Sequence, residues 1–97
     1  MARISLKNKM LIVDQAERTV RKALELKAYN SHGAIDWNEE EIKSIGLNDV
    51  TYGVLQQRSQ TQKANRCIFE VLKGSDIEEA IEKMIRHFRI DFGIDGD

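Results

Sequence analysis

The residues best suited to chemistry lie between Val50 and Phe69, a stretch without a carboxylate in a chain that has 16 Asp and Glu residues. This stretch contains three cations, Arg58, Lys63 and Arg66, and four of the five glutamines of the chain. Arginine and amide side chains form paired hydrogen bonds with base edges, whereas lysine, serine and threonine contact phosphates. The composition therefore predicts a surface that binds nucleic acid, although an exposed helix face that happens to use glutamine would look the same.

The net charge of the whole chain hides this contrast. Fifteen Lys and Arg residues and 16 Asp and Glu residues give a net charge of −1, which excludes a bulk polycation. By segment, the net charge is +4 for residues 1–30, −4 for 31–50, +3 for 51–74 and −4 for 75–97. Because oppositely charged blocks can occupy separate faces of a folded protein, a near-neutral total is compatible with nucleic-acid binding.

Residues 38–57 resemble the helix-turn-helix of bacterial and phage transcription regulators. In that motif a short helix ends at a glycine, an apolar residue follows, and a second helix lies in the major groove. Gly46 stands at the turn glycine and Leu47 at the apolar position after it, while Ile45 and Leu55 match two further apolar positions. The resemblance implies sequence-specific binding of double-stranded DNA by the second helix.

This stretch departs from the family pattern in two places. Ile42 stands where alanine is usual, and Tyr52 stands where a smaller branched residue is usual. Two bulky residues there would open the angle between the helices, as in an ordinary helix–glycine–helix corner. The DNA-binding residues that we expect are Thr51, Tyr52, Gln56, Gln57, Arg58, Gln60, Lys63 and Arg66. The three cations among them would contact phosphates.

The elements that must position these residues are helical, because the chain has no proline and its apolar residues recur at helical spacing. We predict an all-α fold, a compact bundle of four or five helices that forms a single domain over residues 1–97. Its parts are a first helix at about 8–29, a helix-turn-helix-like corner at 37–58, a helical hairpin at 62–89 and a short extended tail at 90–97.

Capping boxes predict where three of the helices begin. The corner would consist of helices at about 37–45 and 49–58, and the hairpin of helices at about 62–73 and 76–89. In the tail, alternating apolar residues are typical of a short strand or of a segment that packs Phe92 onto the core. The three capping boxes run from Asp36 to Glu39, from Ser59 to Gln62 and from Ser75 to Glu78.

Signals for catalysis, metal binding or a membrane are weak. Cys67 is the only cysteine, and His32 and His87 have no Cys or His at ligand spacing, so no Cys-cluster zinc site is expected. Neither a phosphate loop nor a dinucleotide fingerprint is present. No apolar run approaches the roughly 18 residues of a membrane span. We therefore expect a non-catalytic, cytoplasmic protein without cofactor or metal.

Two other interpretations stay open. The chain could be a small helical protein-interaction module, an adaptor or inhibitor of phage or plasmid type, whose acidic residues 75–97 meet a basic protein partner. A ribbon-helix-helix would instead use residues 3–7 as the groove-reading strand of a dimer, but an acidic helix stands where that fold needs its second helix. DNA binding also predicts a homodimer, because two recognition helices about 34 Å apart match one turn of DNA.

Overall fold

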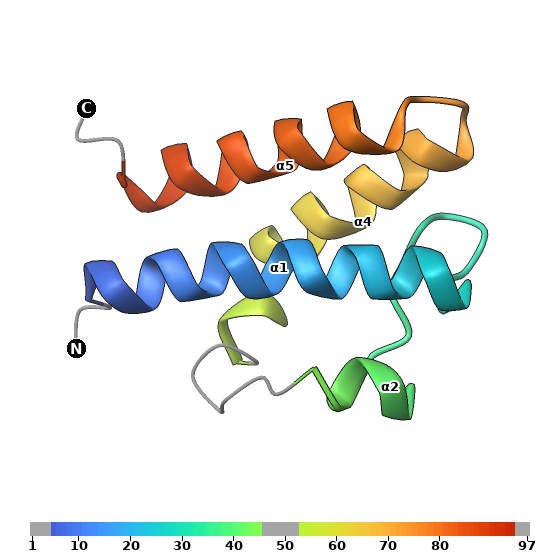
Figure 1. The fold of residues 1–97 in the computed structure, drawn as a ribbon, viewed down its shortest axis with the longest axis horizontal. Coiled ribbons are helices and arrows are strands. Elements are labelled where there is room, and N and C mark those ends of the chain that lie inside the picture. The colour runs from blue at the N-terminus through green and yellow to red at the C-terminus, as the bar shows by residue number, and fades with distance from the viewer. Residues whose placement is uncertain (1–4, 46–52, 95–97) are drawn as a thin grey trace.

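The computed structural model describes residues 5–45 and 53–94. Figure 1 shows three longer helices packed together, with a short helix on the side of the first that faces away from the last. Within the described residues there is no strand beyond an isolated antiparallel bridge between Tyr29 and Ile35. The predicted all-α helical bundle is therefore confirmed. Its helices are α1 (Leu6–Leu26), α2 (Glu40–Lys43), α4 (Arg58–Leu72) and α5 (Ile77–Phe92), and residues 53–55 are also helical.

Helix α1 begins and ends earlier than the predicted residues 8–29. At its start, the Ser5 hydroxyl caps the helix by accepting a hydrogen bond of 3.2 Å from a backbone N–H three residues on. At its end, Lys27 adopts a left-handed conformation with φ +56°. The N–H of Ala28 then bonds back to the Ala23 carbonyl at 2.9 Å. This hydrogen bond ends α1 at Leu26, before the glycine-containing loop at which the sequence predicts the end of the helix.

The loop between α1 and α2 is held against α4. Gly33 has φ +82°, and a Cβ added there would lie 2.7 Å from the Asn65 carbonyl oxygen and 2.8 Å from the Phe69 nitrogen. Two residues later, the Ile35 N–H donates to Asn65 Oδ1 at 3.3 Å. A left-handed backbone this close to another helix requires glycine. The Asn65 side chain therefore has a structural role, in the middle of the carboxylate-free stretch.

Helix α2 has only four residues, whereas the sequence predicts a helix at about 37–45. Asp36 does not cap a helix: its carboxylate accepts a hydrogen bond from the Asn38 N–H at 3.0 Å, which forms a turn. Ile42 is fully buried and anchors α2 against α1. The corner expected between the two helices of the motif falls at residues 46–52, outside the described residues.

Helix α4 begins at Arg58, four residues before the predicted start. Residues 53–55 are helical, and the chain then bends, with the Gln57 N–H bonded to the Val54 carbonyl at 3.0 Å. The helix predicted at 49–58 therefore does not reach residue 58. Arg58 belongs to the first turn of α4 and not to the last turn of a recognition helix.

The capping box predicted at Ser59 to Gln62 does not start a helix, because both residues already lie inside α4. The helix is tied to the preceding turn by Thr61, whose hydroxyl donates to the Leu55 carbonyl at 2.8 Å. Leu55 is buried, as the inward position of the predicted motif requires. Helix α4 is therefore longer at its start than its local signals indicate.

The predicted C-terminal helical hairpin is confirmed, since α4 and α5 form the most extensive helix contact in the described structure. The N-cap of α5 is Asp76, one residue later than the capping box places it. Its carboxylate accepts a hydrogen bond from the Glu79 N–H at 3.1 Å. The negative first turn suits the positive end of the helix dipole.

The extended tail predicted from residue 90 is wrong for residues 90–92, which belong to α5. Phe92 follows Phe88 at a spacing of four residues, which places both rings on the core side of one helix. The helix ends at Gly93, where φ is +67° and the Ile94 N–H bonds back to the Arg89 carbonyl at 3.0 Å. Phe92 does pack against the core, as the sequence indicates.

The core is one cluster to which α1, α4 and α5 contribute. Lys9 Nζ donates to the Phe92 carbonyl at 3.1 Å, so the start of α1 lies beside the end of α5 and the two helices are antiparallel (Figure 1). In residues 5–45 and 53–94, none of the helices has the length and apolarity needed to cross a membrane. The largest fully buried side chains are Phe88, Ile12, Ile42, Leu55, Ile68, Ile81, Val20 and Thr19.

Candidate nucleic-acid interface

One exposed face of α4 carries three cations and an amide. Arg58, Gln62, Arg66 and Lys73 are exposed. They follow one another at spacings of four, four and seven residues, which place them on one side of a helix. We call these four residues the α4 ridge, which is about 22 Å long at 1.5 Å per residue. Two of the predicted site residues, Arg58 and Arg66, thus share one surface.

The α4 ridge contains no acidic residue, and within the described residues Arg58 and Arg66 form no ion pair. The one carboxylate of α4, that of Glu70, pairs with Lys83 of α5 at 3.3 Å. The first turn of α4 also has no acidic residue, and its N-cap makes no side-chain hydrogen bond. The positive end of the helix dipole therefore adds to the charge of the two arginines, and this surface suits an anion such as phosphate.

Two predicted site residues of α4 turn toward α5. Gln60 is only 5% exposed, and its Nε2 donates to Asp91 Oδ2 at 2.7 Å. Lys63 Nζ lies 3.5 Å from the same carboxylate and 5.7 Å from the centre of the Phe88 ring, with 19% of its side chain exposed. Gln60 lies on the buried stripe of α4, four residues before Ala64. The expectation that Gln60 reads DNA is therefore corrected, and the charge of Lys63 is partly neutralised.

The remaining predicted residues lie before α4. Gln56 and Gln57 are exposed in the bend that leads into α4 and directly precede Arg58, the first residue of the α4 ridge. Thr51 and Tyr52 fall outside the described residues. Only the last part of the expected groove-reading segment is thus described. It offers two exposed amide side chains, which suit base edges, beside Arg58, which forms no ion pair within the described residues.

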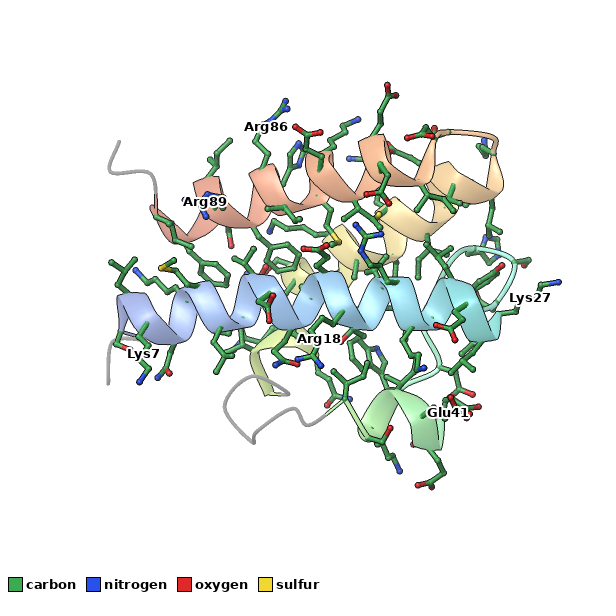
Figure 2. The ribbon with its side chains drawn as sticks, in the orientation of Figure 1. Lys7, Arg18, Lys27, Glu41, Arg86 and Arg89 are labelled. Carbon is green, nitrogen blue, oxygen red and sulfur yellow. The ribbon has the colours of Figure 1, made fainter. Side chains whose placement is uncertain are left out.

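The second half of α5 contributes cations that the sequence interpretation missed. The first half of α5 carries three glutamates and Lys83, whereas Arg86 and Arg89 lie in its second half together with Asp91. Because α4 and α5 are antiparallel, this basic half lies beside the first half of α4 (Figure 1). Figure 2 shows Arg86 projecting from α5 away from α1. The order of charges along α5 is visible in the sequence, but the total of −4 for residues 75–97 conceals it.

The most strongly paired ions of the described structure lie on another side of the bundle. Arg21 Nη1 and Nη2 donate to the two carboxylate oxygens of Glu78 at 2.7 and 3.0 Å, and Arg21 Nε donates to Glu17 Oε2 at 2.9 Å. These hydrogen bonds hold the pKa of Glu78 below its usual value and raise the pKa of Arg21. The hydrogen bonds of Arg21 thus connect α1 to the start of α5 at an exposed position, which indicates a structural role.

The described residues offer no group of three or more His, Cys, Asp and Glu side chains that could hold a metal ion. His32 is exposed in the loop after α1, and His87 is exposed on α5. Cys67 is buried on α4, and this burial raises its pKa to about 11, so the thiol stays neutral near pH 7. The positive surface around the α4 ridge therefore remains the best candidate site of the described structure.

Comparison of the chain with protein-family models, with curated protein sequences and with solved structures found no significant match. The functional argument for this protein therefore rests on its own residues and their geometry.

Proposed function

We propose that this protein binds double-stranded DNA as a sequence-specific, non-catalytic regulator, and that its α4 ridge lies against the DNA. The observation that carries the proposal is the pair of exposed arginines, Arg58 and Arg66, on a helix face without carboxylates. An α-helix fits the major groove of B-form DNA, which is about 12 Å wide. Cations without an ion pair can be offered to phosphates without first breaking an internal contact.

The residues of this surface have different tasks in the proposal. Gln56 and Gln57 directly precede α4, and recognition helices commonly contact base edges with their N-terminal residues. Arg58 and Arg66, on the ridge, and Arg86, on α5, would contact phosphates on the flanks of the groove. Thr51 and Tyr52 stay in the proposal as residues that border the groove.

The charge distribution sets the expected strength of binding. Since the chain has a net charge of −1, attraction to DNA must come from this one face and not from the whole molecule. Each phosphate that a cation neutralises releases counterions, so the logarithm of affinity falls with the logarithm of salt concentration by about 0.9 per contact. Three or four contacts per protomer predict weak non-specific binding that disappears at moderate salt.

A homodimer is part of the same proposal, because a single ridge presents few cations and two of them would read both halves of a symmetrical site. DNA half-sites that are read by a two-fold dimer are about 34 Å apart. Sedimentation of the protein with and without a selected duplex measures this stoichiometry directly. A regulator of this kind would act in the cytoplasm, where it meets the chromosome.

The experiment that tests the proposal is a fluorescence-anisotropy titration of labelled duplexes between 50 and 200 mM salt, after selection from a random-sequence library. The decisive variant is the double substitution Arg58→Ala with Arg66→Ala. Its matched control is Arg18→Ala with Lys27→Ala. This variant also removes two exposed cations, one within α1 and one at the C-cap position of α1 (Figure 2). Absence of duplex binding at the lowest salt, or equal loss in both double variants, would remove the proposal.

One observation favours the second candidate function, a protein-interaction module. Leu6 is 58% exposed and Met10 is 50% exposed, one helical turn apart at the start of α1. This end of α1 lies beside the end of α5, where Phe92 is only partly buried. An exposed apolar surface of this kind suits a protein partner. Leu6→Ser with Met10→Ser would abolish partner binding and leave DNA binding unchanged if the two functions use separate surfaces.

A further inference from the structure

A hollow of about 550 Å³ lies between α4 and α5, and we call it the α4–α5 groove. Cys67, Ala80 and Met84 line it and are all buried, and the first two have short side chains that leave the space open. Sites for small organic ligands commonly measure about 300–1,000 Å³ and combine an apolar lining with a few polar groups. The groove has the size of such a site, and three of its ten lining residues, each at most 4% exposed, form its apolar lining.

The other lining residues are polar or charged. Lys63 and Arg66 line the groove from α4, Lys83 and His87 line it from α5, and Glu70 is its one carboxylate; Ser59 and Gln62 complete the lining. Lys63 is close to Asp91, and Lys83 pairs with Glu70. Arg66 forms no ion pair within the described residues. An available guanidinium therefore stands next to an apolar lining.

We infer that the α4–α5 groove binds a small amphipathic anion, namely a carboxylate carried on a short aliphatic or aromatic body. The apolar body would contact Cys67, Ala80 and Met84, and the carboxylate would accept hydrogen bonds from the Arg66 guanidinium, which offers a planar pair of donors. A cation of the same shape is disfavoured, because Lys83 pairs with Glu70 and Lys63 lies close to Asp91, which leaves the positive charge of Arg66 at the groove. This inference does not depend on DNA binding.

The neutral state of the thiol agrees with an apolar lining. Burial raises the pKa of Cys67 to about 11, so this side chain carries no charge at neutral pH. Free inorganic phosphate would find the same cations but would leave the apolar lining uncovered. Comparison of an amphipathic carboxylate with inorganic phosphate therefore separates binding of the proposed ligand class from simple attraction of anions.

The test uses the methionine methyl groups as reporters. Met84 lines the groove, whereas Met10 is half-exposed on α1 and serves as an internal control. Protein labelled with ¹³C at the methionine methyls is titrated with octanoate, with octylammonium and with inorganic phosphate. We expect octanoate to shift the Met84 resonance with saturation and to leave that of Met10 in place. Octylammonium should bind at least fivefold more weakly, and phosphate should not shift the Met84 resonance.

Two matched variants test whether the carboxylate of the ligand binds at Arg66. Arg66→Gln should weaken octanoate binding about five- to tenfold, because the carboxylate loses a charged partner, whereas Arg18→Gln on α1 should not change it. Both arginines are exposed, so both variants are expected to fold. The inference is overturned if the Met84 resonance does not move, if octylammonium binds as tightly as octanoate, or if Arg66→Gln has no effect. Duplex titration of Arg58→Ala, which lies outside the groove, reports separately on the proposed DNA function.

Discussion

Gln60 Nε2 donates a hydrogen bond of 2.7 Å to Asp91 Oδ2, and this contact joins the first turn of α4 to the last turn of α5. The same carboxylate lies 3.5 Å from Lys63 Nζ. In the sequence these two side chains belong to a stretch without carboxylates. Among the predicted site residues that the structure describes, these two have an acidic partner, so they separate from Arg58 and Arg66 in function.

Replacement of Gln60 by alanine should therefore affect stability and not base preference. The variant removes a buried side chain and its hydrogen bond to a carboxylate, which typically costs about 1–3 kcal/mol in the free energy of unfolding. Urea denaturation measures this loss. Gln62→Ala, on the exposed ridge two residues on, should remain within about 0.5 kcal/mol of the wild type. A changed base preference at unchanged stability would contradict the assignment.

The three cations of the carboxylate-free stretch should differ in their effect on DNA affinity. Arg58→Ala and Arg66→Ala are each expected to weaken binding to any duplex and to reduce the salt slope by about one, because each removes one phosphate contact. Lys63→Ala should reduce the slope by much less, since its ammonium group is near Asp91 and only 19% of its side chain is exposed. Anisotropy titrations at four or more salt concentrations measure the slopes. Equal reductions for all three variants would show that the contact with Asp91 opens on DNA.

Gln56→Ala should relax the preference at one base pair and leave the salt slope unchanged. Its side chain is exposed next to the start of α4, and a well-placed amide discriminates between bases by about 1–3 kcal/mol. Competition between the selected duplex and its single-base variants measures the loss. Uniform weakening over all duplexes would instead identify Gln56 as a contact to the DNA backbone.

Gly33→Ala should destabilise the fold more than Gly74→Ala does. Both glycines have positive φ, +82° and +106°, so alanine strains the backbone at either position. At Gly33 the new Cβ would also lie 2.7 Å from the Asn65 carbonyl oxygen, whereas at Gly74 no atom lies within 4 Å. We expect about 1–2 kcal/mol from the strain at both sites, and a further loss from the clash at Gly33 alone. Thermal unfolding of the two variants provides the comparison, and equal losses would argue against the close packing of this loop on α4.

The ion pair between Arg21 and Glu78 should give stability that depends on acid pH. Arg21 lowers the pKa of Glu78 in the folded state, so the pair stabilises the fold above the unfolded pKa, which is about 4.3 for glutamate. This stability is lost as the pH falls through the lower, folded-state pKa. The difference in unfolding free energy between the wild type and Glu78→Gln should thus be present at pH 7 and vanish in acid. A difference that stays constant down to pH 2 would assign the effect to packing.

Most helices can be predicted from local features of this chain, because apolar spacing and caps act over a few residues. The apolar spacing of α5, for example, predicts one inward stripe. Four of its residues, Ala80, Ile81, Met84 and Phe88, are buried, whereas Ile85 is only partly buried and Ile77 is 44% exposed. Local features do not predict the structure where the same side chain can stabilise two different local structures. The Asp36 carboxylate can cap a helix or close a turn, and here it closes a turn.

Some features of the candidate site can likewise be predicted from local sequence, and others depend on the tertiary structure. The exposed positions of Gln62 and Arg66 follow from helical spacing against the buried stripe. The place of Arg58 on the same helix does not, because the sequence predicts Arg58 at the end of the preceding helix. The contribution of α5 does not follow either, because the position of its basic half beside α4 depends on the antiparallel hairpin. Gln60 precedes the predicted start of this helix, so its inward position and its acidic partner become visible only in the folded chain.

The sequence alone determines that this protein is helical and that one stretch combines arginines and amides without carboxylates, since both properties depend on residues near one another in the chain. Which cations of that stretch remain available is decided by tertiary structure alone. Asp91 approaches Lys63 because the hairpin brings the end of α5 to the start of α4, whereas Arg66, further along α4, forms no ion pair within the described residues. The charge of a surface depends on distances in space, and only folding sets those distances.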